Sequence, residues 1–342
     1  MSEKLTFAQV RENARPLLKN CKVCPECDGR ACRGALPGVG GKGNGACFVR
    51  NYEKLQSVKL HLDTMYDQGT LDTSMELFGK KISIPVFAGP MAAIENQFGP
   101  KYDTETFSRI LLQHSKDIGT VTFLPGSPDE MIAKLCAEFP GQGIPTIKPW
   151  PLDVILQKAK LYEEAGAFAI ATDLDGAGLA AVQGGAVPVM PHGVETIREL
   201  VKALNIPVII KGVMTVAGAK KCVKAGVAGI VVSNHGGRVM EQGLSTAEVL
   251  PGIADAVAGR LTVMVDGGIR TGTDLFKIRA LGAQAALIGR PFGVAVFGGD
   301  QEGINLYTNK LTGELREAMM MTGAETLEDI CREMVHIPKD FY

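Results

Sequence analysis

The segment GIVVSNHGGRVMEQG, residues 229–243, ends an apolar, β-branched run in a base, a cation and two glycines. The imidazole of His235 has an ordinary pKa near neutrality and can accept a proton, whereas the guanidinium of Arg238 can hold a carboxylate by two parallel hydrogen bonds. The glycines between them let a ligand approach the backbone closely. A lone histidine at a strand end is more often structural, but a base beside a carboxylate clamp indicates proton removal from a small 2-hydroxy acid.

Other polar residues follow apolar runs in the same way. Asp175 can orient an imidazole and stabilise the imidazolium that forms. Lys211 supplies a fixed positive charge for an electron sink that becomes negative during a reaction. The polar residues that end apolar runs are Lys148, Asp173, Asp175, Lys211, Ser233, His235, Asp266 and Arg290.

Two neighbouring glycine–arginine segments indicate an anion site. DGGIRTGTD (266–274) and IGRPFG (288–293) each offer backbone N–H groups, an arginine and a helix start. Each glycine taken alone is explained by an ordinary tight turn. Because both segments follow the last two apolar runs, we expect them to bind a phosphate.

The elements that must position these residues alternate regularly along the chain. Eight apolar runs are each followed by a turn signal, and helix-like spacing lies between them, which predicts parallel strands covered by helices. Eight units favour a (β/α)₈ TIM barrel of the α/β class. The alternative, a Rossmann-type domain with an extra domain, lacks a G-x-G-x-x-G after its first strand. The runs are 84–89, 119–124, 144–148, 167–172, 207–212, 228–233, 261–268 and 284–289.

This pattern divides the chain into two predicted parts. Residues 1–80 form an N-terminal extension with a cysteine cluster and a glycine-rich loop, and MSEKLTFAQVREN at its start predicts a short amphipathic helix. Residues 81–342 form the barrel, with a C-terminal helical cap after about residue 300.

Composition excludes several classes of protein. The 342 residues are 46% hydrophobic and 21% charged with a net charge of −1, so a large core is available. Basic residues are scattered, which does not favour nucleic acid or an anionic membrane surface as a partner. No apolar run is long enough to span a bilayer, and no secretory signal is present. We therefore expect a cytoplasmic protein.

Four motifs carry a family resemblance. PVIIKGV, GIVVSNHGGR, VMVDGGIRTGTDLFKIRALGA and ALIGRPF resemble the FMN-dependent 2-hydroxy-acid oxidase and dehydrogenase family, which includes glycolate oxidase and lactate oxidase. The match is dense from about residue 205 to 293 and looser upstream. The combination of S-N-H-G-G-R with D-G-G-x-R is far more specific than a phosphate loop alone.

The resemblance implies a role for each matching residue. His235 would be the active-site base, Asp175 its carboxylate partner, and Arg238 the ligand of the substrate carboxylate. Lys211 would stabilise the reduced flavin at its N1/O2 edge. The reaction implied is oxidation of an L-2-hydroxy acid, such as lactate, to the 2-oxo acid. The residues implied to contact FMN are Gly89, Pro90, Met91, Lys148, Lys211, Ser233, Asp266, Gly268, Arg270, Gly289 and Arg290.

The sequence also departs from the family pattern around the substrate. The family carries a second arginine in the loop after its fourth strand, whereas this loop has none and Val182 lies near that place. Lys148 replaces a glutamine, Trp150 a tyrosine, and Asp173 a threonine. Lys148 could serve as a substitute cation or pair with Asp173, and we favour the pair.

A cysteine cluster lies outside the resemblance. CKVCPECDGRAC places Cys21, Cys24, Cys27 and Cys32 in a C-x₂-C-x₂-C-x₄-C run, which suits a tetrahedral Zn²⁺ or an iron–sulfur cluster. The familiar ferredoxin run has a three-residue last gap, so reduced thiols on a flexible arm are the alternative. The following segment, GALPGVGGKGNGACF, predicts a mobile loop that closes over the site.

Two other functions remain open on sequence alone. One is different chemistry on an FMN barrel, such as an isomerase or a reductase, and the other is a non-catalytic flavin or metal redox sensor. The expected partners are a small-molecule substrate, an electron acceptor (oxygen or a redox protein) and further copies of this chain as a homo-oligomer.

Overall fold

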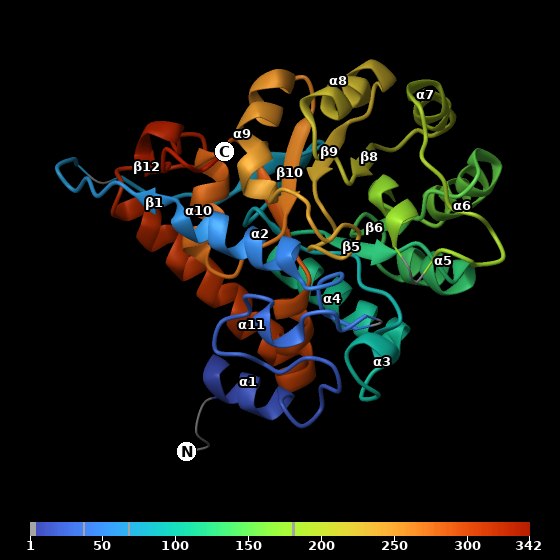
Figure 1. Cartoon of the computed structure of the whole chain (residues 1–342), viewed down its shortest axis with the longest axis horizontal. Coiled ribbons are helices and arrows are strands. Elements are labelled where there is room, and N and C mark those ends of the chain that lie inside the picture. The colour runs from blue at the N-terminus through green and yellow to red at the C-terminus, as the bar shows by residue number, and fades with distance from the viewer. Residues whose placement is uncertain (1–4, 37, 68, 180–181) are drawn as a thin grey trace.

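The computed structural model describes residues 5–36, 38–67, 69–179 and 182–342. Eight parallel strands close into a barrel in the order β10-β11-β4-β5-β6-β7-β8-β9, with helices around the outside (Figure 1). Each of these strands lies within a predicted apolar run or extends at most one residue beyond it, so the predicted (β/α)₈ barrel is confirmed. The strands are β4 (Val86–Ala88), β5 (Thr122–Pro125), β6 (Gly143–Ile147), β7 (Ile170–Asp173), β8 (Val208–Lys211), β9 (Gly229–Val232), β10 (Thr262–Asp266) and β11 (Ala285–Ile288).

Burial on both faces explains why the strand sequences are continuously apolar. Apart from the two ends of β10, every residue of the eight barrel strands is buried. The register of β7 and β8 pairs Asp173 with Lys211. The parallel arrangement therefore brings the polar ends of the strands to one mouth of the barrel.

The helices of the barrel follow the strands and begin at recognisable caps. Ser245 and Thr271 form capping boxes with Glu248 and Asp274 at the starts of α9 and α10. The long helix α11 is interrupted at Asp300, whose φ is 50°. The helices are α3 (Ile94–Gln97), α4 (Thr104–Ile118), α5 (Asp129–Glu138), α6 (Leu152–Glu164), α7 (Val194–Ala203), α8 (Val216–Ala225), α9 (Thr246–Val257), α10 (Gly272–Ala280) and α11 (Arg290–Met320).

The segments before the barrel pack against it. Helix α1 (Phe7–Ala14) lies along α11, and α2 (Ala46–Ser57) lies near α9 and α10 (Figure 1). The predicted N-terminal helix is thus confirmed from Phe7, and its first four residues lie outside the described residues. Short strands β1 (Lys59–Leu60) and β12 (Val335–His336) pair, as do β2 (Met75–Leu77) and β3 (Lys80–Ile82). The division of the chain at residue 80 stays a prediction.

The glycine-rich loop lies across the β9 end of the barrel mouth. The backbone N–H of Lys42 donates to Gly237 O (2.8 Å), and its Nζ donates to Val239 O (3.1 Å). This position agrees with a loop that covers the site, and its mobility stays a prediction.

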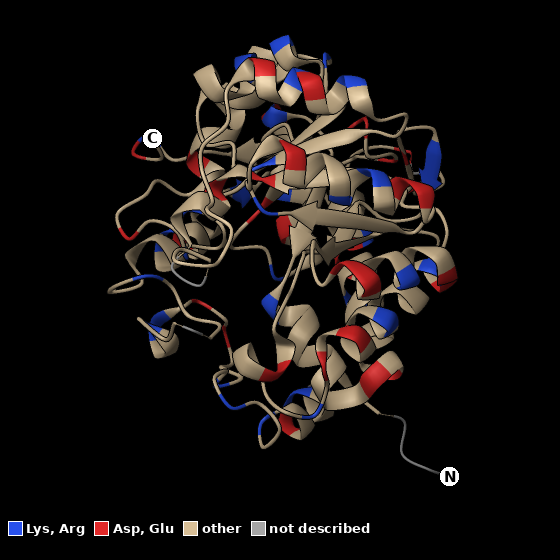
Figure 2. Cartoon of the chain, turned by 90° about the vertical axis from the view of Figure 1, so that its right-hand side faces the viewer, with Lys and Arg blue, Asp and Glu red and all other residues tan. Residues whose placement is uncertain are grey.

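The exterior agrees with the expectation from composition. Basic and acidic residues are interspersed along the outer helices on the face that Figure 2 presents. Among the described helices, none combines the length and the apolar character that crossing a bilayer requires.

Candidate active site

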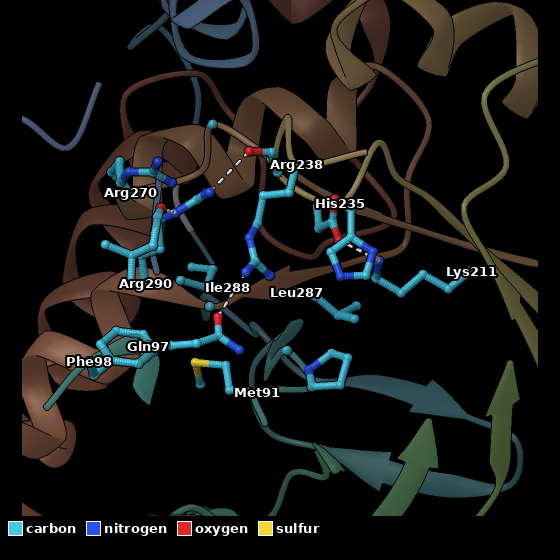
Figure 3. A pocket seen from close by; sticks show the side chains of 18 residues that line it. Met91, Gln97, Phe98, Lys211, His235, Arg238, Arg270, Leu287, Ile288 and Arg290 are labelled. Carbon is cyan, nitrogen blue, oxygen red and sulfur yellow. Dashed lines mark hydrogen bonds and ion pairs between the residues drawn. The ribbon is translucent and has the colours of Figure 1, made fainter. Parts of the chain in front are cut away.

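One cavity at the mouth of the barrel collects the ends of several strands. Lys211 reaches it from β8, His235 and Arg238 from the loop after β9, and Arg290 from the start of α11 (Figure 3). The sequence-predicted residues that line it are Gly89, Pro90, Met91, Lys211, His235, Arg238, Asp266, Gly268, Arg270, Gly289 and Arg290. His235, Lys211 and Arg290 thus share a single cavity.

The backbone after β9 explains the two glycines of this loop. His235 has a φ of 58°, in the left-handed region that histidine tolerates better than most residues, and its N–H donates to Ser233 Oγ (3.0 Å). A Cβ at Gly236 would lie 2.7 Å from Arg290 Nη1, and one at Gly237 would lie 2.4 Å from the backbone nitrogen of Phe48. Position 237 therefore requires glycine because the backbone of Phe48 packs against it, and the φ of 63° at Gly236 favours glycine there.

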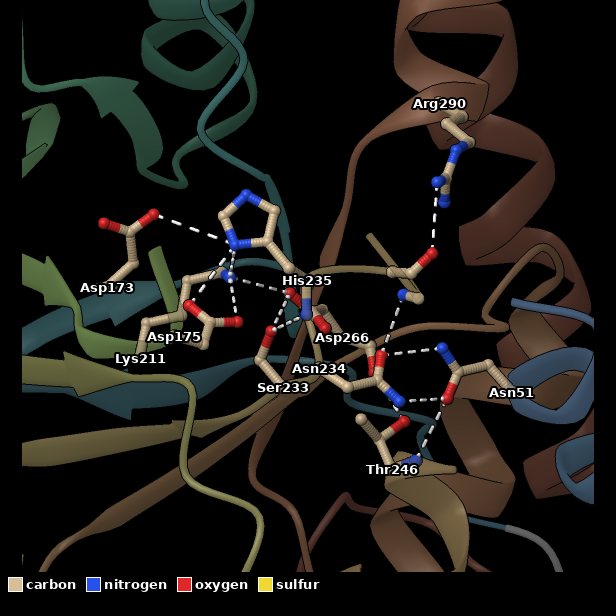
Figure 4. A network of polar contacts seen from close by, with 12 residues as sticks. Asn51, Asp173, Asp175, Lys211, Ser233, Asn234, His235, Thr246, Asp266 and Arg290 are labelled. Atoms are coloured by element: carbon tan, nitrogen blue, oxygen red, sulfur yellow. Dashed lines mark hydrogen bonds and ion pairs between the residues drawn. The ribbon is translucent and has the colours of Figure 1, made fainter. Parts of the chain in front are cut away.

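The surroundings of His235 hold its ring neutral. Burial, then the positive charges of Lys211 and Lys148, lower the pKa of His235 well below its ordinary value. Its Nδ1 lies 3.3 Å from Asp175 Oδ1 and 3.5 Å from Lys211 Nζ (Figure 4). The ammonium of Lys211 can only donate and the carboxylate of Asp175 can only accept; because the carboxylate is the nearer of the two, we assign the ring proton to Nδ1, which leaves Nε2 as the basic nitrogen.

Lys211 keeps its charge in spite of complete burial. Burial alone would lower the pKa of Lys211, but the carboxylates of Asp175, Asp266 and Asp173 outweigh burial and raise it. Its Nζ lies 3.6 Å from Asp266 Oδ2 and 3.8 Å from Asp175 Oδ2. The cavity therefore contains a fixed cation next to the base.

Arg238 extends between His235 and Arg290 toward α3 (Figure 3). Its Nη2 donates to Gln97 Oε1 (2.9 Å) and to Gly38 O (3.1 Å). Its Nε is buried and has no hydrogen-bond partner among the described residues. A buried donor left unpaired in this way is suited to a ligand with acceptor oxygens.

A second set of donors lies where α11 begins. Gly289 caps α11 without a side-chain hydrogen bond, so the first N–H groups of a long helix are free of a side-chain cap. Arg290 stacks on Phe48, with Cζ 3.8 Å from the ring centroid, and burial lowers its pKa to about 10. Arg270 Nη2 is buried, and no described residue accepts its hydrogen bond. These unpaired donors fit the phosphate of FMN.

Three predicted site residues lie behind the cavity wall. Asp175 Oδ1 lies against His235 Nδ1 (3.3 Å), and Ser233 Oγ donates to Asp266 Oδ2 (2.8 Å). Lys148 Nζ lies 2.6 Å from Oδ2 of the fully buried Asp173, which confirms the pair that we favoured over a free cation. Direct contact of Lys148 and Ser233 with the flavin stays a prediction.

Several residues that support the site carried no sequence signal. Asn51 of α2 exchanges two side-chain hydrogen bonds of 2.8 Å with Asn234 and accepts from Thr246 N (3.1 Å) (Figure 4). Gln97 holds Arg238, and Phe48 lies under Arg290. Asn51 and Gln97 belong to no motif, and Phe48 only ends the glycine-rich segment, because the partners of all three lie far away in the sequence.

The four cysteines of the N-terminal cluster line a second cavity. Cys21, Cys24, Cys27 and Cys32 are free thiols of intermediate burial. Val39, Arg270 and Arg290 line both cavities, so one layer of residues separates the thiols from the active site.

Comparisons with known proteins agree with this geometry. The chain is 30% identical to 4-hydroxymandelate oxidase of Amycolatopsis orientalis over 346 aligned positions, which cover 87% of this chain and 94% of that protein. It is 44% identical to a peroxisomal (S)-2-hydroxyacid oxidase of Arabidopsis thaliana over 133 residues, which cover 38% of this chain and 36% of that protein. A crystal structure of mandelate oxidase with benzoyl-formic acid superposes with a TM-score of 0.80 at 27% identity, with 98% of each chain covered.

A family model described as FMN-dependent dehydrogenase matches residues 38–142 and 152–337. This match covers most of the barrel and most of the glycine-rich loop, and it leaves the cysteine cluster outside. The chain therefore belongs to the FMN-dependent dehydrogenase family.

Proposed function

We propose that this chain uses FMN, bound at the barrel mouth, to oxidise an L-2-hydroxy acid to the corresponding 2-oxo acid. The observation that carries the proposal is the neutral imidazole of His235 in one cavity with Lys211 and Arg238. Relatives named 4-hydroxymandelate oxidase and (S)-2-hydroxyacid oxidase support this substrate class.

The residues that would hold FMN line the cavity where α11 begins, and among them Arg270 Nη2 is buried without a partner in the described chain. Arg270, Arg290 and the first N–H groups of α11 would bind the phosphate, and the backbone of 89–91 would border the ring. Lys211 would lie against the part of the ring that gains negative charge on reduction. When bound, FMN supplies the acceptor for the two electrons that leave the substrate.

The role of His235 is to take a proton from the substrate. Its Nε2 is the basic nitrogen, and Asp175 stabilises the imidazolium because its carboxylate lies 3.3 Å from Nδ1. Arg238 orients the substrate by its carboxylate, using the Nε that has no partner within the described chain.

The substrate carboxylate would be held by one arginine rather than two. No arginine occurs between residues 174 and 193, and Lys148 is neutralised by Asp173. Each charge-assisted hydrogen bond that is absent weakens binding by about 1.5–3 kcal/mol. We therefore expect small acids such as lactate to need high concentrations.

Anaerobic mixing with a panel of L-2-hydroxy acids tests the proposal. The oxidised flavin colour should bleach with at least one acid in the parent protein. The variant His235→Ala should stay coloured and fail to bleach. The control variant His61→Ala, which changes an exposed histidine outside the cavity, should bleach like the parent. A His235→Ala variant that bleaches at the parent rate would remove His235 from this role.

The same experiment separates the alternatives. A redox sensor would keep its colour with every acid and bleach only with a general reductant, and an isomerase would turn over without net bleaching. The electron acceptor, the homo-oligomeric state and the cytoplasmic location stay predictions.

A further inference from the structure

The cavity lined by the four cysteines has no part in the proposed oxidation. It has a volume of about 310 Å³ and lies between the loop that follows α1 and the first turns of α11. Cys21, Cys24, Cys27 and Cys32 face it together, and all four are reduced. Four cysteines on one cavity offer the thiolate donors that zinc and iron–sulfur sites use.

The loop that carries these cysteines is held in shape. Arg11 of α1 donates to the carbonyl of Cys24, Arg15 Nη1 donates to Lys22 O (2.9 Å), and Arg270 Nε donates to Cys27 O (3.0 Å). A Cβ at Gly29, where φ is 89°, would lie 2.6 Å from the ring of Phe48. These contacts argue against thiols on a flexible arm.

The spacing of the sulfur atoms argues against a preformed zinc site and leaves room for a larger cluster. Tetrahedral Zn²⁺ with Zn–S bonds of about 2.3 Å requires Sγ atoms about 3.8 Å apart. Among the described residues, no three of the cysteines have Sγ atoms that all lie within 4.8 Å of one another. An iron–sulfur cluster places iron and sulfide between its thiolates and so holds them farther apart.

The charge of the cavity wall fits an anionic cluster. Of the described residues that line it, Glu26 is the only acid, and the cations are Arg11, Lys22, Arg270, Arg290 and Lys310. Phe7 and Tyr307 stack with ring centroids 5.0 Å apart and form part of an apolar wall. A cluster held by four thiolates carries net negative charge, which this surrounding positive potential stabilises.

We propose that Cys21, Cys24, Cys27 and Cys32 ligate a [4Fe–4S] cluster between the N-terminal loop and α11. Arg270 and Arg290 border both this cavity and the candidate active site, so the cluster would lie behind the phosphate end of the flavin site. The site is independent of the proposed substrate chemistry, because none of the four thiols lines the active-site cavity.

The test is chemical analysis of the whole chain after anaerobic reconstitution with ferric iron, sulfide and a thiol that reduces part of the iron. The parent should hold about four iron and four acid-labile sulfide per chain and should give an EPR signal after reduction. The variants Cys21→Ser, Cys24→Ser, Cys27→Ser and Cys32→Ser should each lose most of the iron. The control variants Cys222→Ser and Cys331→Ser, at a buried and an exposed cysteine, should keep it.

Thiol alkylation of the parent gives a readout that does not depend on the folding of variants. After reconstitution, Cys21, Cys24, Cys27 and Cys32 should be protected from alkylation, while the exposed Cys331 should react. A parent that binds neither iron nor sulfide, a parent that binds one zinc per chain, or full labelling of the four thiols would each overturn the proposal. Flavin content and bleaching are measured separately, so failure of the cluster and failure of the oxidase function are distinguishable.

Discussion

Replacement of Asp175 by asparagine tests how the base is stabilised. The substitution keeps the shape and a hydrogen-bond acceptor beside His235 Nδ1 but removes the charge that the imidazolium meets at 3.3 Å. Two unit charges at this distance interact by about 5 kcal/mol at an effective dielectric constant of about 20. The retained hydrogen bond recovers part of this energy, so we expect a loss of about 3–5 kcal/mol in transition-state stabilisation.

This loss corresponds to a flavin reduction rate that is lower by about a hundred- to several-thousand-fold. The assay is stopped-flow anaerobic reduction of the bound flavin with saturating substrate, which isolates the step in which His235 accepts the proton. The variant Asp255→Asn, at an exposed carboxylate paired with Arg332, is the matched control and should leave the rate unchanged. An Asp175→Asn variant within about threefold of the parent rate would refute this role of the carboxylate.

Three further predictions address the Lys148–Asp173 pair, the base His235 and Gly236. Lys148→Met leaves the buried Asp173 without its ion-pair partner and should lower the free energy of unfolding by about 3–5 kcal/mol. Urea titration measures this loss, and an unchanged midpoint would mean that the pair adds nothing to stability. Burial and two lysines lower the pKa of His235, and the active form of the base is neutral. The acidic limb of the pH profile of kcat/KM should therefore lie below pH 6.5, and a limb above that pH would contradict this prediction. Gly236→Ala places a Cβ 2.7 Å from Arg290 Nη1 at a φ of 63° and should reduce the FMN content of the purified protein. Flavin absorbance measures this content, and an FMN content equal to that of the parent would contradict the prediction.

The barrel was predictable because its signals are local. Each strand is a short apolar run, and Lys211 and Asp266 each end one, so the closed parallel topology alone brings them together. The pairing of Lys148 with Asp173 was also predictable, because β6 and β7 are neighbours and both residues lie at the same end.

The supporting residues were not predictable because their partners come from tertiary packing. Asn51 meets Asn234 only when α2 docks against the loop after β9, 183 positions further along the chain. Gln97 lies in a four-residue helix that has no periodicity to reveal it, and its contact with Arg238 depends on how that helix packs. Sequence pattern locates the groups that do chemistry and says little about the groups that hold them.

The most direct measurement compares the rates at which an L-2-hydroxy acid and the same acid deuterated at C2 bleach the bound flavin without oxygen. If the C2–H bond of the substrate is broken in the cavity that contains His235, Arg238 and Lys211, the flavin of the parent protein should bleach several-fold more slowly with the deuterated acid. No bleaching with any 2-hydroxy acid, from a protein whose FMN is readily reduced by dithionite, would contradict the account.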